Sequence, residues 1–315
     1  MTIATRHIGS LAVSTVGIGC NNFGRELDAA ATRAIVHAAL DAGITFFDTA
    51  DSYGRPKTTS ETLLGEVLAP HRDAVVIATK FGRRLDDRDG GASPAYVRAA
   101  TEASLRRLRT DRIDLMQLHI PDPATPIGET LDALGELVRQ GKIREVGVSN
   151  MSAAELREAA AASAAAGRPR VVSTQAEFNL LHREAVADVL AACNAADVKL
   201  LPFRPLFHGL LTGKYRAGDP VAAGTRIGNK GVGQQADILS DANLARIEAL
   251  TAFAGEQGHS LLELAFAWLL AHPAVPSVIA GVTSARQVAS NVAAAGWALS
   301  GDDKAEVDRL LDWIA

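Results

Sequence analysis

The chain has 315 residues, of which 48% are hydrophobic and 22% are charged, and its formal net charge at pH 7 is -4. Mixed charges in this proportion are ordinary for a globular protein and do not indicate a nucleic acid or another polyanion as a partner. No basic segment followed by an apolar run opens the sequence, and no apolar run reaches the ~18 residues that a membrane helix needs. We therefore expect a cytoplasmic protein without a membrane partner.

The chain has few residues of the kinds that bind metals or form disulfides. Its only cysteines, Cys20 and Cys193, are too few for a disulfide framework or a thiolate cluster. Neither His-x-x-x-His nor Cys-x-x-Cys occurs, and the carboxylates do not cluster with histidines in the sequence. We expect no metal ion and a reducing compartment.

The predicted elements alternate between strands and helices along the chain. After a β-hairpin around Gly9 and Ser10, short apolar runs that end in polar or turn residues predict eight strands. Stretches with apolar residues three and four positions apart, such as 32–40, 95–108 and 127–138, predict the helices between them. The predicted strands are 13–20, 44–50, 75–81, 113–119, 144–150, 171–178, 199–205 and 277–282.

Two later segments need separate interpretation. The alanine-rich run 159–166 is predicted to be helical, because alanine is the strongest helix former and Gly-Arg-Pro at 167–169 then ends the pattern. The segment between Pro205 and a helix that begins near Asp241 is rich in glycine and contains proline and glutamine. A long irregular segment inside a compact domain is commonly functional, so we expect this loop to lie over the site.

The alternation predicts an α/β fold with parallel strands joined by right-handed crossovers. Eight such units close naturally into a (β/α)8 TIM barrel, here with an N-terminal β-hairpin and long loops at the C-terminal face of the strands. A barrel of this length forms one domain, so we expect residues 1–315 to be a single domain.

Ionisable side chains stand at the ends of three consecutive predicted strands. Asp48 ends the second strand, Lys80 lies near the end of the third, His119 ends the fourth, and Tyr53 follows Asp48 by five positions. Each has an ordinary structural interpretation by itself, such as a helix cap or a solvated strand end. In a parallel barrel, however, the strand C-termini meet at one mouth, so these four side chains are expected to converge.

These positions lie within a series of segments that resembles the aldo-keto reductase family. The segments, in chain order, are GITFFDTADSYG, SETLLGEVL, VVIATKFG, IDLMQLHIPDP, GKIREVGVSN, GLLTGKY and VIAGVTSARQVASN. The resemblance spans nearly the whole chain. It implies a carbonyl reductase that uses a nicotinamide cofactor and small carbonyl substrates, with a catalytic set formed by Tyr53, Asp48, Lys80 and His119.

The resemblance assigns a role to each of these residues. Tyr53 is expected to donate the proton to the alkoxide that hydride transfer creates. The ammonium of Lys80 would bring the phenol pKa, ordinarily about 10, toward the working pH. Asp48 would keep Lys80 charged and oriented, and His119 would donate a hydrogen bond to the substrate oxygen.

The resemblance also implies residues that hold the cofactor. No Gly-x-Gly-x-x-Gly follows the first strand, so a Rossmann-type site is not indicated. Ser149, Asn150 and Gln175 resemble the polar trio that binds the nicotinamide carboxamide. Phe203 stands where the family stacks an aromatic ring on nicotinamide. The remaining cofactor candidates are Arg204, Pro205, Leu206, Lys214, Arg226, Gly281, Thr283, Gln287 and Asn291.

Several of these positions depart from the family pattern. Arg204 replaces a small hydroxyl or aromatic residue and is compatible with either the cofactor pyrophosphate or an anionic substrate. His208 also stands where small residues are common. Gly281 and Gln287 occupy positions that carry a lysine and an arginine in other branches, which weakens a preference for the 2'-phosphate of NADPH. NADPH is favoured because of Lys214 and Arg226, and NADH stays open.

The expected function is NAD(P)H-dependent reduction of aldehydes or ketones to alcohols. One alternative is an NAD-linked sugar- or pyridoxal-type dehydrogenase, and another is a cofactor-binding regulatory subunit of potassium channels with little turnover. The variable segments 83–92 and 216–235 leave the substrate open, and the sequence does not indicate an oligomeric state.

Overall fold

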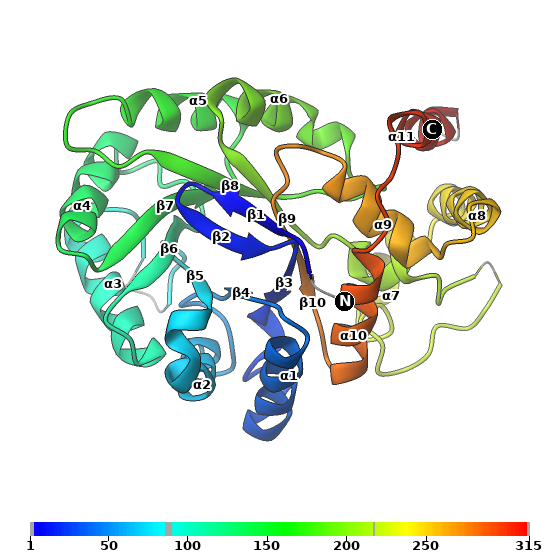
Figure 1. Ribbon diagram of the computed structural model, residues 1–315, viewed down its shortest axis with the longest axis horizontal. Coiled ribbons are helices and arrows are strands. Elements are labelled where there is room, and N and C mark those ends of the chain that lie inside the picture. The colour runs from blue at the N-terminus through cyan, green and yellow to red at the C-terminus, as the bar shows by residue number, and fades with distance from the viewer. Residues whose placement is uncertain (1–2, 86–89, 217, 314–315) are drawn as a thin grey trace.

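In the computed structural model, described over residues 3–85, 90–216 and 218–313, eight parallel strands curl into a barrel (Figure 1). They follow one another around the sheet in chain order, and the last strand pairs with the first. The strands are β3 Val16–Gly19, β4 Phe46–Asp48, β5 Val76–Phe81, β6 Ile113–Leu118, β7 Ile143–Ser149, β8 Val171–Glu177, β9 Lys199–Phe203 and β10 Val278–Gly281. The predicted (β/α)8 barrel is confirmed.

Helices surround the sheet and lie on its outer side (Figure 1). Two of them, α5 and α9, begin with a capping box in which Ser152 pairs with Glu155 and Ser260 pairs with Glu263. The helices are α1 Ala29–Asp41, α2 Thr59–Leu68, α3 Pro94–Leu108, α4 Ile127–Arg139, α5 Ala153–Ala162, α6 Ala187–Ala196, α7 Val232–Ile238, α8 Asp241–Glu256, α9 Leu261–Leu270, α10 Ala285–Ala294 and α11 Gly301–Trp313. Short 3-10 helices are η1 Cys20–Asn22, η2 Ala69–Ala74, η3 Glu184–Val186 and η4 Phe207–Thr212.

The predicted hairpin is confirmed and closes the floor of the barrel. Strands β1 Thr5–Ile8 and β2 Leu11–Ser14 pair antiparallel across the end that faces the viewer in Figure 1. Gly9 makes the turn with a φ of 56°, where a side chain would clash with Glu145, and Ser10 N donates to Glu145 Oε1 at 2.7 Å. The mouth of the barrel is therefore the opposite end, where the strands have their C-termini.

Most predicted bounds differ from the structure by a few residues, and three differences are larger. The predicted strand 13–20 spans the end of β2 and all of β3. The alanine-rich helix ends at Ala162, because Ser163 Oγ donates to Ala159 O and the chain then turns. The segment predicted to be irregular contains α7, which begins after Gly231. Residues 86–89 and 217 of the predicted loops lie outside the described residues.

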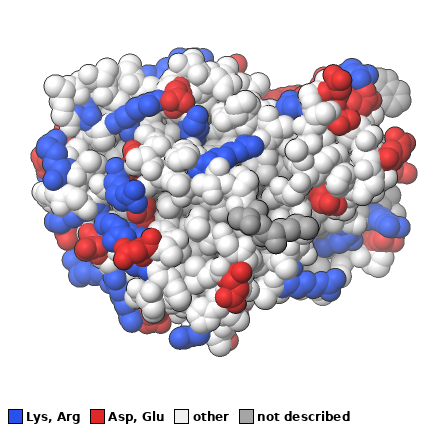
Figure 2. Space-filling view, in the orientation of Figure 1, with Lys and Arg blue, Asp and Glu red and all other residues white. Residues whose placement is uncertain are grey.

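Figure 2 shows Lys, Arg, Asp and Glu dispersed over the hairpin face of the molecule. Within the described ranges, no helix is both long enough and apolar enough to cross a membrane.

Candidate active site

The four predicted catalytic residues converge at the mouth of the barrel. Asp48 is the last residue of β4, Lys80 is the penultimate residue of β5, and His119 directly follows β6. These three strands are neighbours in the sheet, and the register of β5 and β6 places Lys80 beside Gln117. Tyr53 lies in the loop that leaves β4, with its backbone N–H bonded to Ala50 O at 3.1 Å. The sheet thus brings together residues that are up to 71 positions apart.

Lys80 and Asp48 form a buried ion pair. Lys80 Nζ lies 2.6 Å from Asp48 Oδ2, and the two residues are 1% and 4% exposed. The ammonium also donates to Thr49 O at 2.8 Å and to the Tyr53 hydroxyl at 3.4 Å. An ammonium has three donors, so these three acceptors satisfy it completely. Burial lowers the pKa of Lys80, but Asp48 and Tyr53 more than offset this, and the net shift is upward.

The pKa of Tyr53 moves in the direction opposite to the sequence-based expectation. Burial of the hydroxyl raises its pKa above the ordinary value, and the ammonium of Lys80 offsets only part of that shift. Lys80 acts with the expected sign, but desolvation is the larger effect. Tyr53 is therefore protonated at neutral pH, which is the state that a proton donor requires.

His119 is a neutral imidazole at the same mouth. Burial, then the charge of Lys80, lowers its pKa to about 2. Its ring meets the ring of Tyr53 edge to face, with centroids 5.7 Å apart, and its Nδ1 lies 3.4 Å from Ser52 Oγ. Because a neutral imidazole carries one N–H, His119 is able to donate a single hydrogen bond next to the Tyr53 hydroxyl.

Asp48 is held from its other side by two amides. Gln175 Nε2 donates to Asp48 Oδ1 at 2.6 Å, and Gln117 Nε2 donates to the same oxygen at 3.2 Å. Sequence reasoning placed Gln175 at the cofactor, whereas the structure commits its amide nitrogen to Asp48. Sequence reasoning missed Gln117, although a glutamine near the end of a fully buried strand is a visible signal.

Ser149 and Asn150 lie at the end of β7, as predicted. Asn150 Nδ2 donates to Ser149 Oγ and to His119 O, both at 2.9 Å, and Ser149 Oγ donates to Gln175 O at 3.4 Å. Asn150 adopts a φ of 58°, a left-handed conformation that asparagine tolerates. This network connects the predicted carboxamide-binding residues to the backbone of His119.

Phe203 is the last residue of β9, and Arg204 follows it on the next part of the rim. Arg204 Nη1 pairs with Glu177 Oε2 at 2.7 Å, and its backbone oxygen accepts from Asn179 Nδ2 at 3.1 Å. The neighbouring predicted residues Pro205 and Leu206 continue this rim toward η4. Arg204 therefore already has an acidic partner.

A cluster of cations surrounds the loop that follows β9. The charges of Lys230, Arg204 and Arg226 act on His208 after its burial, and together they lower the pKa of His208 to about 4. Arg25 acts on Arg226 and Lys230 as well. His208 Nδ1 is buried without a hydrogen-bond partner among the described residues.

Sequence reasoning found Arg226 in this cluster but missed Arg25 and Lys230. The predicted Lys214 is exposed, and its Nζ lies 3.3 Å from the point where a side chain on Gly209 would begin. Arg204 is paired with Glu177, and Arg25 lies 3.9 Å from Glu26. Arg226 and Lys230, without an ion-pair partner among the described residues, leave the region around His208 with a net positive charge that suits phosphate groups.

The predicted adenine-side residues follow β10. Gly281 lies against Arg226, whose Nη1 is 3.7 Å from the point where a side chain on Gly281 would begin. Gln287 Oε1 accepts from Thr283 N at 2.7 Å, so its carboxamide closes the start of α10. Asn291 is buried within α10. The structure thus brings the adenine-side segment and the cation cluster together.

Asp51 is a buried carboxyl next to this site that sequence reasoning missed. It is 0% exposed, and neither of its carboxyl oxygens has a hydrogen-bond partner among the described residues. Burial, then the negative charge of Glu61, raises its pKa to about 8. Asp51 is therefore a neutral acid at neutral pH.

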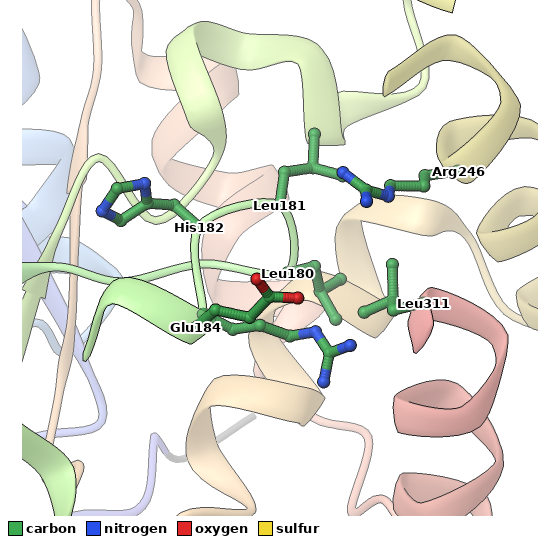
Figure 3. A pocket seen from close by; sticks show the side chains of 7 residues that line it. Leu180, Leu181, His182, Glu184, Arg246 and Leu311 are labelled. Atoms are coloured by element: carbon green, nitrogen blue, oxygen red, sulfur yellow. The ribbon is translucent and has the colours of Figure 1, made fainter. Parts of the chain in front are cut away.

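A hollow in the outer layer is separate from these residues (Figure 3). It has a volume of about 190 Å³ and lies between the segment after β8, α8 and α11. Figure 3 shows Leu180, Arg246 and Leu311 turned toward it. It contains none of the predicted site residues.

Comparison with known proteins identifies a family. The model of the Aldo/keto reductase family matches residues 15–312. An L-glyceraldehyde 3-phosphate reductase of Escherichia coli O157:H7 is 33% identical over 92% of this chain and 86% of its own length. An uncharacterized oxidoreductase of Mycobacterium tuberculosis (strain ATCC 25618 / H37Rv) is 36% identical over 93% of this chain and 87% of its own length. A protein of Oryza sativa subsp. japonica, named "Probable voltage-gated potassium channel subunit beta", is 32% identical over 90% of this chain and 88% of its own length.

Proposed function

The chain belongs to the aldo/keto reductase family, and we propose that it reduces aldehydes and ketones to alcohols with a reduced nicotinamide cofactor. The observation that carries this proposal is the buried Asp48–Lys80 pair, whose ammonium also reaches the Tyr53 hydroxyl. When bound, the cofactor supplies the hydride that adds to the carbonyl carbon. The residues of the mouth handle the charge that then develops on oxygen.

Tyr53 is the proposed proton donor. Its hydroxyl transfers a proton to the carbonyl oxygen as the carbon–oxygen double bond becomes a single bond, and Lys80 stabilises the phenolate that remains. Solvent then returns the proton to Tyr53. Asp48 is a positioning residue. Its carboxylate contacts Lys80 and two glutamine amides, and it keeps the ammonium of Lys80 charged and in place.

His119 is proposed to donate a hydrogen bond to the same carbonyl oxygen. Its neutral state suits this role, since a neutral N–H donor polarises the carbonyl without repelling the ammonium of Lys80. The edge-to-face contact between the rings of His119 and Tyr53 supports placing both donors on one oxygen.

The residues after β9 and β10 fit a phosphate-rich dinucleotide. The cations Arg25, Arg226 and Lys230 provide the donors that a pyrophosphate and a 2'-phosphate require, and His208 Nδ1 is a buried polar atom without a partner there. Phe203 stands at the end of β9 beside them. Because of this positive charge, we propose that the protein binds NADPH more tightly than NADH.

Two other functions remain as alternatives. The likeness to a potassium channel β subunit motivates a regulatory cofactor-binding role, but the complete Asp48–Lys80–Tyr53 arrangement favours turnover. The second alternative is an NAD-linked sugar- or pyridoxal-type dehydrogenase, because Gln287 is hydrogen-bonded to Thr283. Against it, the guanidinium of Arg226 lies next to Gly281 and favours a cofactor with a 2'-phosphate. The name of the Escherichia coli relative supports an aldehyde as the carbonyl substrate.

The test begins with fluorescence titration of the purified protein with NADPH and with NADH. Decay of the absorbance of the reduced cofactor is then followed with a panel of aldehydes and ketones. Tight NADPH binding with turnover is the expected result. Binding without turnover across the panel supports the regulatory role, and a preference for NADH supports the dehydrogenase.

A further inference from the structure

One cation at the mouth has no part in the chemistry described above. Arg83 lies three positions after Lys80, just beyond the end of β5 and the turn at Gly82. The end of β5 is tied to the site, because His119 N donates to Phe81 O at 2.8 Å. Arg83 therefore begins its loop on the same rim as Lys80 and His119.

The loop that carries Arg83 is anchored on both sides. Gly91 N donates to Gly82 O at 3.0 Å, which closes the base of the loop. Lys57 Nζ donates to the backbone oxygens of Arg84 and Leu85, each at 2.8 Å. Lys57 belongs to the segment that follows Tyr53, so it fastens the Arg83 loop to the Tyr53 loop.

The charge of Arg83 reaches the reacting groups. Burial and Lys80 dominate the pKa of Tyr53 and of His119, and the positive charge of Arg83 acts on both groups as well. These are the two side chains proposed to face the carbonyl oxygen. A guanidinium that influences both of them lies within electrostatic range of a bound substrate.

Arg83 is exposed and has no ion-pair or hydrogen-bond partner among the described residues. The nearby acid Asp122 is engaged elsewhere, because it accepts from Ala92 N at 2.8 Å, Ala124 N at 3.0 Å and Thr125 Oγ1 at 2.8 Å. By contrast, Arg204 on the opposite rim is neutralised by Glu177. The guanidinium of Arg83 thus has no carboxylate partner within the described residues, which leave out 86–89.

We propose that Arg83 binds an anionic group, a carboxylate or a phosphate, on the carbonyl substrate. This inference rests on the proposed function and specifies its substrate class. A guanidinium presents paired N–H donors that match the oxygens of a carboxylate or phosphate, and it stays charged at every working pH. The bonds from Lys57 to the backbone of Arg84 and Leu85 reduce the entropy lost when Arg83 binds the substrate.

The experiment compares matched substrates that differ in one anionic group. 4-Carboxybenzaldehyde is paired with benzaldehyde, and glyceraldehyde 3-phosphate is paired with glyceraldehyde. The measured quantity is the ratio of kcat/KM for the anionic member to that for the neutral member of each pair. Because any effect of Arg83 on Tyr53 applies to both members, the ratio isolates recognition of the anion.

Arg83→Gln is expected to lower this ratio by about tenfold for at least one pair, and Arg83→Glu is expected to lower it further. The pair that responds distinguishes a carboxylate from a phosphate. Arg106→Gln, in the last turn of α3 and close to the N-terminal end of β6, removes an exposed arginine at the end of the barrel opposite the mouth and is expected to leave both ratios unchanged. Rising salt should reduce the ratio of the wild-type protein and not that of Arg83→Gln. Equal ratios in the wild type and Arg83→Gln for both pairs overturn the proposal.

A binding measurement separates failure of this inference from failure of the proposed function. Calorimetric titration with 4-(hydroxymethyl)benzoate and with benzyl alcohol, each in the presence of NADP+, requires no turnover. Tighter binding of the benzoate that is lost in Arg83→Gln supports the anion site even if no aldehyde is reduced. Turnover of neutral aldehydes without any effect of Arg83 on either ligand preserves the reductase and removes the anion site.

Discussion

Gln175 reaches across the barrel to Asp48, with 2.6 Å between Gln175 Nε2 and Asp48 Oδ1. A glutamine on β8 thereby fixes the acid on β4 that holds Lys80, the lysine proposed to act in catalysis. The contact makes Gln175 a positioning residue for Lys80, in addition to any contact with cofactor that its carbonyl oxygen makes.

We predict that Gln175→Leu destabilises the protein by about 1–3 kcal/mol, because a buried carboxylate oxygen loses a donor. Urea unfolding measures this loss. Gln117→Leu is the matched control, since its bond to the same oxygen is longer, at 3.2 Å, and a smaller loss is expected. Equal stability of Gln175→Leu and the wild type would show that the contact contributes nothing.

Asp51→Asn is predicted to stabilise the protein increasingly as the pH rises. The folded-state pKa of Asp51 is about 8, against about 3.9 in an unfolded chain. Between these values the folded state keeps a proton that the unfolded state releases, so the stability of the wild type falls with rising pH. The full stabilising contribution of protonated Asp51 is present below about pH 4, and it is lost as the pH rises through the folded-state pKa.

Denaturant unfolding at several pH values measures this effect. The stability difference between Asp51→Asn and the wild type should grow with pH, at up to about 1.4 kcal/mol per unit, and then level off. Asp41→Asn is the control for the loss of one carboxylate, because Asp41 is exposed at the end of α1 and its side chain has no ion-pair or hydrogen-bond partner in the part of the chain that the structure describes. A difference that does not change with pH would mean that Asp51 is ionised in the folded protein.

Arg226→Gln and Lys230→Gln are predicted to weaken NADPH binding by about tenfold and NADH binding less. The reason is that the cation cluster is the proposed site of the cofactor phosphates. Fluorescence titration with each cofactor measures the dissociation constants. Equal losses for the two cofactors would assign these cations to the pyrophosphate, which both cofactors carry.

The rate of aldehyde reduction is predicted to be flat across neutral pH. Burial holds the pKa of His119 near 2 and raises that of Tyr53, so neither group changes its charge in this range. The value of kcat/KM should fall only at alkaline pH, as Tyr53 loses its proton. A transition near pH 6 or 7, by contrast, would indicate a titrating histidine in the catalytic step.

The sequence predicts the barrel because apolar runs and helical periodicity alternate through the chain. It also predicts the meeting of Asp48, Lys80 and His119, since residues at the ends of parallel neighbours share one mouth. The positions of these residues follow from topology alone. The sequence does not predict the charge of Tyr53, because that depends on how much its hydroxyl is desolvated relative to the reach of Lys80.

Other features required the structure because they depend on pairing across distant segments. The sequence analysis assigned Gln175 to the cofactor, yet its side chain donates a hydrogen bond to Asp48, which is 127 residues away in the chain. Lys230 and Arg25 come from loops far apart in the chain, and nothing in either loop indicates the other. Asp51 is one residue in a polar turn by its sequence, and only its burial distinguishes it.

The most direct test of the central claim compares Tyr53→Phe with the wild type. Both are assayed with NADPH and an aldehyde from the panel that the wild type reduces. Steady-state kinetics and cofactor titration are measured on the same preparations. We predict that kcat falls by about 100-fold or more while the dissociation constant of NADPH changes little, because only the proton donor is removed. Activity close to that of the wild type would contradict the assignment of Tyr53 as the proton donor.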